Sequence, residues 1–355
     1  MSFPRLTGIA ALGALALVLS GCAGQQQTAI GVDQITLATL GTVTPSQQAF
    51  IDRMNELSEG TVTLKVTENW QPAGGSGSPE DELTKAVLAG DVDIAWVTVR
   101  SLSAIGVKGI DALEAPLLIQ THDQQRAVAL GVPGELITSA LRTTGVAGLA
   151  LLPGPTQYPI AATAPVVDVT DWAGKTVQVS SQNAVEAATV TALGATASDG
   201  ADTVEDLVAG SAQVTTGNPV DLVPGGATAT GPFLTSNVAL WPRMSMILMN
   251  RDVQDRLSNR QHGFLDGSVV RAQDIAMAAP DLATAVADSC TAGTKFAVAT
   301  ADQITAITEA VKPVYTTLEG DAADKKLLQA IQEVVKRTAG TGAFSVAPAC
   351  RWVAP

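Results

Sequence analysis

Short strand patterns alternate along this chain with helices that have clear start signals, and this alternation constrains the fold more than any other feature. Residues 35–40 and 93–99 have the apolar content of strands. Thr44-Pro45-Ser46-Gln47 and Asn183-Ala184-Val185-Glu186 have the capping-box pattern that opens a helix. Repeated strand–helix units predict an α/β fold with mainly parallel pairing. After Arg251 the apolar spacing becomes mostly helical, which predicts a helical C-terminal part.

Composition narrows the class of protein. The chain has 355 residues, of which 46% are hydrophobic, so it can bury a core for two domains or for one two-lobed unit. Its formal net charge is −13, and its Lys and Arg residues do not cluster. These features disfavour binding to nucleic acid, because phosphate binding requires clustered cations. After the N-terminus, no apolar stretch approaches the ~18 residues that a membrane-spanning helix needs.

The N-terminus has the features of an export signal. Arg5 precedes an apolar run, and Leu19-Ser20-Gly21-Cys22 resembles the bacterial lipobox. We therefore expect residues 1–21 to be a lipoprotein signal peptide, Cys22 to carry a lipid, and residues 22–33 to form a tether. The lipid would anchor the protein to the outer face of the cytoplasmic membrane, within the cell envelope. The alternative is an ordinary secretory signal that ends near a chance cysteine.

The two remaining cysteines, Cys290 and Cys350, are expected to form a disulfide, because an exported protein meets an oxidising compartment. The alternative is a pair of buried thiols. No cofactor is expected. A metal site is not expected either, since His122 and His262 are the only histidines and neither lies near a cysteine in the sequence.

Four segments, taken in their order and spacing, resemble one family of exported proteins. They are ELTKAVLAGDVDIAWV (residues 82–97), IDALEAPLLIQTHDQQRAV (110–128), VVDVTDWAGKTVQVSS (166–181) and VEDLVAGSAQVTTGNPVDLV (204–223). The set is similar to the solute-binding proteins of tripartite ATP-independent periplasmic (TRAP) transporters, the DctP-like family. The resemblance covers nearly all of the chain after the signal.

The resemblance implies a two-lobed, periplasmic-binding-protein-like α/β fold with a hinge, in which strands cross between the lobes. We place residues 34–155 and 236–290 in lobe I, and residues 156–235 and 291–355 in lobe II. The implied function is to capture a small solute, such as an organic acid, and to pass it to the small and large membrane subunits of a TRAP-type transporter. The alternative is a solute-binding lipoprotein that serves an ATP-driven importer.

Two other classes of function are weighed against this one. An extracellular enzyme is disfavoured, because the chain has no Gly-x-Ser-x-Gly elbow, no His-Glu-x-x-His motif and only two histidines. A catalytic pair of carboxylates stays open, since acidic residues occur throughout the chain. A purely structural envelope lipoprotein is the second alternative, although capped α/β units favour a protein with a cleft.

The chain departs from the family at one expected solute contact. By the resemblance, the strand near residue 178 would carry an arginine that grips a carboxylate of the solute, and Gln178 stands in its place. The asparagine of the family's Asn-Pro pair is retained as Asn218. Because an amide is a neutral donor and acceptor, we expect the solute to be neutral and rich in hydroxyl or amide groups, or to place its acid against Arg100 or Arg243.

Four further residues are candidates for contact with the solute. Trp96 lies on a strand that leads towards the expected cleft, and Trp70 stands near a glycine-rich loop, so either ring could stack on a solute. Glu68 could meet a cationic or hydroxylated solute, and Tyr158 offers a ring and a hydroxyl. The alternatives are core packing for the rings and solvated surface positions for the charged candidates.

Overall fold

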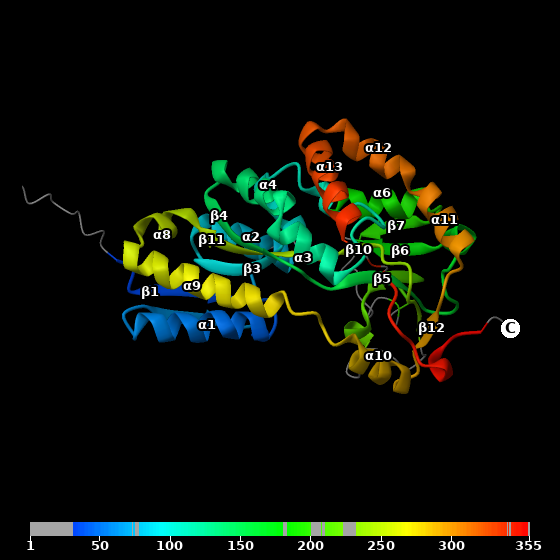
Figure 1. Cartoon of the computed structure of the whole chain (residues 1–355), viewed down its shortest axis with the longest axis horizontal. Helices are drawn as coiled ribbons and strands as arrows, with labels where there is room; N and C mark the ends of the chain where they lie inside the picture. Colours follow the sequence, from blue (N-terminus) through cyan, green and yellow to red (C-terminus); the bar gives the residue numbers. More distant parts are fainter. Residues whose placement is uncertain are drawn as a thin grey trace, which may run out of the picture.

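The computed structural model describes residues 31–72, 74, 78–179, 183–199, 207, 210–222, 232–338, 340 and 342–353. The chain forms two α/β lobes, each built on its own sheet, which lie side by side along the long axis of the molecule (Figure 1). This architecture confirms the predicted two-lobed fold with its helical C-terminal part. The predicted signal peptide, the predicted lipidation site Cys22 and most of the predicted tether lie outside the described residues. No helix within the described part of the chain is both long and apolar enough to cross a membrane.

The sheet of lobe I has the order β2 (Thr63–Thr67), β1 (Gln34–Ala38), β3 (Ile94–Thr98), β11 (Ser245–Asn250) and β4 (Val146–Leu152). One face packs against α1 (Pro45–Ser58), α8 (Arg251–Arg256) and α9 (Asn259–Ala276), and the other against α2 (Pro79–Ala89), α3 (His122–Leu130) and α4 (Val132–Ala140). β11 is antiparallel to both β3 and β4. The expectation of mainly parallel pairing is wrong here, because β11 returns from the other lobe and so enters in the opposite direction.

Helix α1 shows how the sequence determines one of these elements. The Thr44 side chain accepts a hydrogen bond from the backbone NH of Gln47, whose own side chain reaches back to cap Thr44, so the predicted capping box is present. Phe50 and Met54, which are four residues apart, are buried in the same apolar cluster as Leu37 of β1. Burying a side chain of this size stabilises the fold by roughly 1.5–3 kcal/mol.

The sheet of lobe II has the order β12 (Lys295–Ala297), β9 (Phe233–Thr235), β5 (Thr156–Ala161), β8 (Val214–Gly217), β6 (Thr176–Val179) and β7 (Thr196–Asp199), with β10 (Trp241–Pro242) paired to β5. β6 runs parallel to β7 and β8, whereas β5 is antiparallel to β8 and β9. Trp172 and Trp241 are buried in the core of this lobe, together with side chains of α6 (Ala184–Ala192) and α11 (Ala301–Ala310).

Two short crossovers join the sheets and lie against each other. β4 continues into β5 through Pro153-Gly154-Pro155, and β10 continues into β11 through Arg243 and Met244. The backbone NH of Arg243 donates to the carbonyl oxygen of Pro155 at 2.9 Å. A Cβ on Gly154 would collide with the carbonyl oxygen of Arg243. The close approach of the two crossover segments therefore requires glycine at this position. These paired crossovers occupy the position of the expected hinge.

The segments after β11 divide between the lobes differently from the prediction. α10 (Leu282–Thr291) packs against η4 (Pro219–Leu222) of lobe II, and the Ser289 hydroxyl donates to the carbonyl oxygen of Pro219 at 2.8 Å. The lobe I boundary at residue 290 is therefore too late, because α10 belongs to lobe II. α12 (Lys312–Gly320) packs against α6 of lobe II, whereas α13 (Ala322–Arg337) packs against α3 and α4 of lobe I. These two helices thus brace both lobes.

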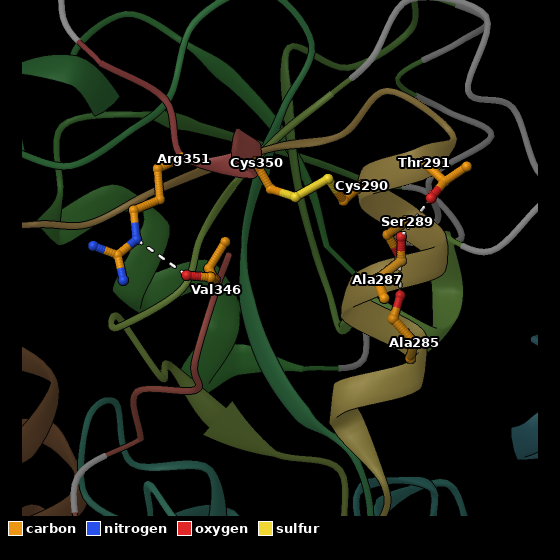
Figure 2. The surroundings of a disulfide bond; sticks show 8 residues. All are labelled: Ala285, Ala287, Ser289, Cys290, Thr291, Val346, Cys350 and Arg351. Carbon is orange, nitrogen blue, oxygen red and sulfur yellow. Dashed lines mark hydrogen bonds between the residues drawn. A yellow bond between two sulfur atoms is a disulfide. The ribbon is translucent and has the colours of Figure 1, made fainter. Parts of the chain in front are cut away.

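The predicted disulfide joins Cys290 of α10 to Cys350 of η5 (Pro348–Cys350), with 5.6 Å between the Cα atoms (Figure 2). Nε of Arg351 donates to the carbonyl oxygen of Val346 at 3.1 Å in the same segment. The backbone NH of Trp352 donates to the carbonyl oxygen of Phe296 at 2.9 Å, next to β12. The disulfide and the Trp352 hydrogen bond fasten the C-terminal segment to lobe II.

We expect reduction of the Cys290–Cys350 bond to lower the free energy of unfolding by about 4 kcal/mol, because its cysteines lie 60 residues apart and the bond restricts the unfolded chain. Denaturant unfolding with and without dithiothreitol measures the difference. The double variant Cys290→Ser/Cys350→Ser is the control, since its stability should match the reduced parent and should not respond to the reductant. Equal stability of the oxidised and reduced parent would contradict this prediction.

Candidate functional site

A cavity of about 490 Å³ lies between the lobes, beside the crossovers. Lobe I contributes the N-terminal ends of α1 and α3, and lobe II contributes Asn218, η4 and the C-terminal segment at residues 342–344. The volume is in the range of sites for small molecules, which commonly lie between domains. The walls of the cavity therefore belong to both lobes.

Gln125 of α3 couples the cavity wall to the crossover. Its Nε2 donates to Oγ1 of Thr156 at 3.1 Å, and its Oε1 accepts from the backbone NH of Gly154 at 2.8 Å. The Gln125 side chain is 1% exposed, so both bonds are shielded from water. This glutamine fixes the chain at the point where it passes from one lobe to the other.

Tyr158 and Asn218, two of the predicted solute contacts, line the same cavity. The Tyr158 hydroxyl donates to the carbonyl oxygen of Gly342 at 2.7 Å, and its ring packs edge-on against Phe344 with 5.2 Å between centroids. Burial raises the pKa of Tyr158, so the phenol stays neutral. Oδ1 of Asn218 accepts from the backbone NH of Val220 at 2.8 Å, which orients the amide at the start of η4.

Buried charges meet where α6 of lobe II approaches lobe I. Glu186 of α6 is fully buried, and its Oε1 lies 3.0 Å from Nη1 of Arg243 and 3.6 Å from Nη1 of Arg100. Arg243 is in the crossover, and Arg100 is in η1 (Val99–Ile105) of lobe I, where its Nε lies 3.4 Å from Oε2 of Glu80. The two arginines that were predicted to hold the charge of an acidic solute thus pair with acids of the protein.

A second polar contact crosses between the lobes nearby. Asn183, the N-cap of α6, donates from Nδ2 to the carboxylate of Glu114 in η2 (Asp111–Glu114). Burial raises the pKa of Glu114 to about 7, although the charge of Arg100 and the hydrogen bond from Asn183 act in the opposite direction. Glu114 therefore changes its charge near neutral pH inside the contact between the lobes.

Gln178 lies on β6 and is buried, opposite Ser198 of β7 in parallel register. β6 is the neighbour of β8, and Asn218 directly follows β8, so both predicted contacts come from adjacent strands of lobe II. Gln178 is not among the described residues that line the 490 Å³ cavity. A role in binding the solute therefore remains a prediction for this residue.

The other three candidates lie in lobe I and make contacts within it. Trp96 packs edge-on against Phe50 with 5.3 Å between ring centroids, and Trp70 packs against the apolar core. Oε1 of Glu68 accepts from the backbone NH of Val43 at 2.6 Å, which fixes the loop before α1. These contacts fit the alternative of packing for both tryptophans and a local structural role for Glu68.

Sequence reasoning missed Glu186 and Glu114 as residues between the lobes. Glu186 was expected to close a capping box, and half of that pattern forms, because Oδ1 of Asn183 accepts from the backbone NH of Glu186 at 3.0 Å. The Glu186 carboxylate pairs with Arg243 instead. The available signal was an acid within the otherwise apolar run of α6. Glu114 gave no such signal, since Asn183 is 69 residues away in the chain.

The profile of the DctP family, described as bacterial extracellular solute-binding protein, family 7, matches residues 38–321. The chain belongs to this family. No curated protein matches the sequence of this family 7 protein.

Solved structures share the two-lobed fold at low identity. A TRAP periplasmic solute-binding protein from Ochrobactrum anthropi, with its C-terminus bound in the ligand pocket, has a TM-score of 0.74 at 20% identity over 87% of this chain and 97% of its own. One from Sulfitobacter sp. NAS-14.1 with bound β-D-galacturonate has a TM-score of 0.73 at 15% identity over 84% and 99%. One from Ralstonia eutropha H16 with bound (S)-2-acetolactate has a TM-score of 0.74 at 17% identity over 86% and 99%. At these identities the likeness establishes the fold of this family 7 protein.

We expect Glu114→Gln to make this family 7 protein more stable than the parent at about pH 8 and to change its stability little at about pH 4.5. Burial raises the pKa of Glu114 from 4.5 to about 7, so the parent loses stability as the pH rises between these values. Above pH 7 the free energy of unfolding of the parent has fallen by the full amount, which is on the order of 3 kcal/mol. Gln keeps an oxygen that accepts from Asn183.

Melting temperatures across this pH range measure the effect. Glu319→Gln, at an exposed position of α12, is the matched control and should leave the pH profile unchanged. An equal difference between Glu114→Gln and the parent at both ends of the range would show that Glu114 does not titrate between the lobes.

Proposed function

We propose that this family 7 protein captures a small organic solute between its lobes and delivers it to a TRAP-type membrane transporter. One observation carries the proposal, namely a cavity of small-molecule size whose walls come from both lobes, beside the paired crossovers. A site of this kind opens when the lobes separate and closes when they meet. Solute binding and lobe closure are then linked, because the solute contacts both lobes only in the closed state.

Membership of a solute-binding family supports binding and delivery of a solute, rather than catalysis, as the function of this site. The small and large membrane subunits of the transporter are the partners that we propose. The charged groups between the lobes pair with one another, which suits a structural latch better than an acid–base pair aimed at a substrate. The protein is therefore proposed to bind and release its solute unchanged.

The N-terminal segment supplies the location of the protein in this proposal. Leu19-Ser20-Gly21-Cys22 favours cleavage before Cys22 and attachment of diacylglycerol to its thiol. The anchor would keep the protein at the outer face of the cytoplasmic membrane, near the transporter subunits. Residues 22–33 would then separate the lipid from lobe I.

Native mass spectrometry of protein extracted from its membrane without refolding tests capture and anchoring together. We expect a chain that begins at Cys22, carries a diacylglyceryl group, and holds one non-covalent small molecule. Val220→Trp, which fills the cavity from an exposed position of η4, should reduce the occupancy about tenfold or more. The matched control is Val270→Trp on α9, because Val270 is 56% exposed and Val220 is 55% exposed.

Empty parent chains, or equal occupancy in Val220→Trp and the parent, would contradict capture in this cavity. An unmodified thiol on Cys22 would contradict the anchor. Membrane vesicles that contain the small and large subunits should take up the released solute without ATP. Uptake that requires ATP would favour the importer alternative.

A further inference from the structure

The described arginines between the lobes already have acidic partners within the protein. Arg100 and Arg243 contribute two positive charges, and Glu80 and Glu186 contribute two negative charges at distances of 3.0–3.6 Å. Glu114 adds negative charge to this region above neutral pH. None of these five residues is among the described residues that line the cavity, and the two arginines already pair with glutamates, so neither offers its charge to an anionic solute there. Burying a charge without a compensating partner is strongly unfavourable.

The described lining of the cavity includes no Lys or Arg side chain. The internal segments that lie outside the described residues, 73, 75–77, 180–182, 200–206, 208–209, 223–231, 339 and 341, contain no Lys or Arg. The described lining of the cavity contains no Lys, Arg, Asp or Glu. The family's arginine position holds the neutral Gln178. The described wall of the cavity therefore has no guanidinium group that could bind a carboxylate through two hydrogen bonds.

Apolar groups form most of the surface that a solute would contact. The wall includes prolines and larger apolar side chains, among them Pro45, Pro153, Pro219, Val220, Leu282 and Phe344. Several polar side chains of the wall already bond within the protein: Gln125 to Thr156, Tyr158 to Gly342, and the His122 ring to the carbonyl oxygen of Met277 at 3.2 Å. Burial of apolar solute surface is then the main source of affinity.

We propose that the cavity between the lobes binds an uncharged, largely apolar organic molecule and disfavours organic acids, because its described wall carries no Lys or Arg and because Arg100 and Arg243 pair with glutamates. The assignment rests on the proposed function, because it gives a chemical class to the captured solute. The proposed solute differs in charge from the organic acids β-D-galacturonate and (S)-2-acetolactate, with which two structural neighbours were crystallised. In this chain Glu186 provides the carboxylate with which the arginines pair.

Two fluorescent probes that differ by one sulfonate test the assignment. N-phenyl-1-naphthylamine is uncharged, and 8-anilinonaphthalene-1-sulfonate has the same rings with a negative charge. We expect the neutral probe to bind the full mature protein saturably with one site per chain. The sulfonate should bind about tenfold or more weakly, because the cavity offers its charge no partner.

A cation placed on the wall should reverse this preference. Val220→Lys should strengthen binding of the sulfonate probe about tenfold relative to the neutral probe. Val270→Lys adds the same charge on α9, where the parent valine is as exposed but does not line the cavity, and should change neither affinity. Circular dichroism of both variants confirms that they are folded before the affinities are compared.

Equal or tighter binding of the sulfonate by the parent would overturn the assignment. A neutral probe that fails to saturate would also overturn it, as would a sulfonate affinity that Val220→Lys leaves unchanged relative to the neutral probe. A large thermal shift of the parent with D-galacturonate would overturn it too, while leaving solute capture intact. If the parent binds neither probe nor D-galacturonate and carries no solute in native mass spectrometry, the proposed function itself fails.

Discussion

The buried carboxylate of Glu186 is the group on which the arrangement of the two lobes depends most. It lies on α6 of lobe II and pairs with Arg243 in the crossover and with Arg100 of lobe I. An ion pair inside a protein is favourable only when its geometry and hydrogen bonds compensate for the loss of hydration. Removal of one partner is strongly destabilising, because it leaves the other charge buried without compensation. The same pairing occupies the two cations that an acidic solute would otherwise need.

The crossovers connect the ion pair of Glu186 and Arg243 to the wall of the cavity. Gly154 allows the β4–β5 connection to lie against the backbone of Arg243, and Gln125 ties that connection to α3. Gln125 and Gly154 also line the cavity between the lobes, so the shape of the cavity depends on the relative position of the lobes. On the far side, the Cys290–Cys350 bond fastens the C-terminal segment that closes the wall.

The sequence predicted what local chemistry determines. The Thr44 cap and the strand patterns depend on residues that are close together in the sequence. The disulfide was predicted from the oxidising compartment that an exported protein meets. These predictions agree with the structure. The direction of β11 and the position of α10 were not predicted, because they depend on where the chain re-enters each sheet. The pairing of Glu186 with Arg243 was missed for a related reason, since charges far apart in sequence meet only through the fold.

Small-angle X-ray scattering of the solute-free protein tests most directly whether Glu186 holds the lobes together. The account predicts that Glu186→Gln has a larger radius of gyration than the parent, because losing one partner of a buried ion pair costs about 3–5 kcal/mol and separates the lobes. Glu319→Gln, an exposed control, should scatter like the parent. A Glu186→Gln variant that is folded and as compact as the parent would contradict the central role of this carboxylate.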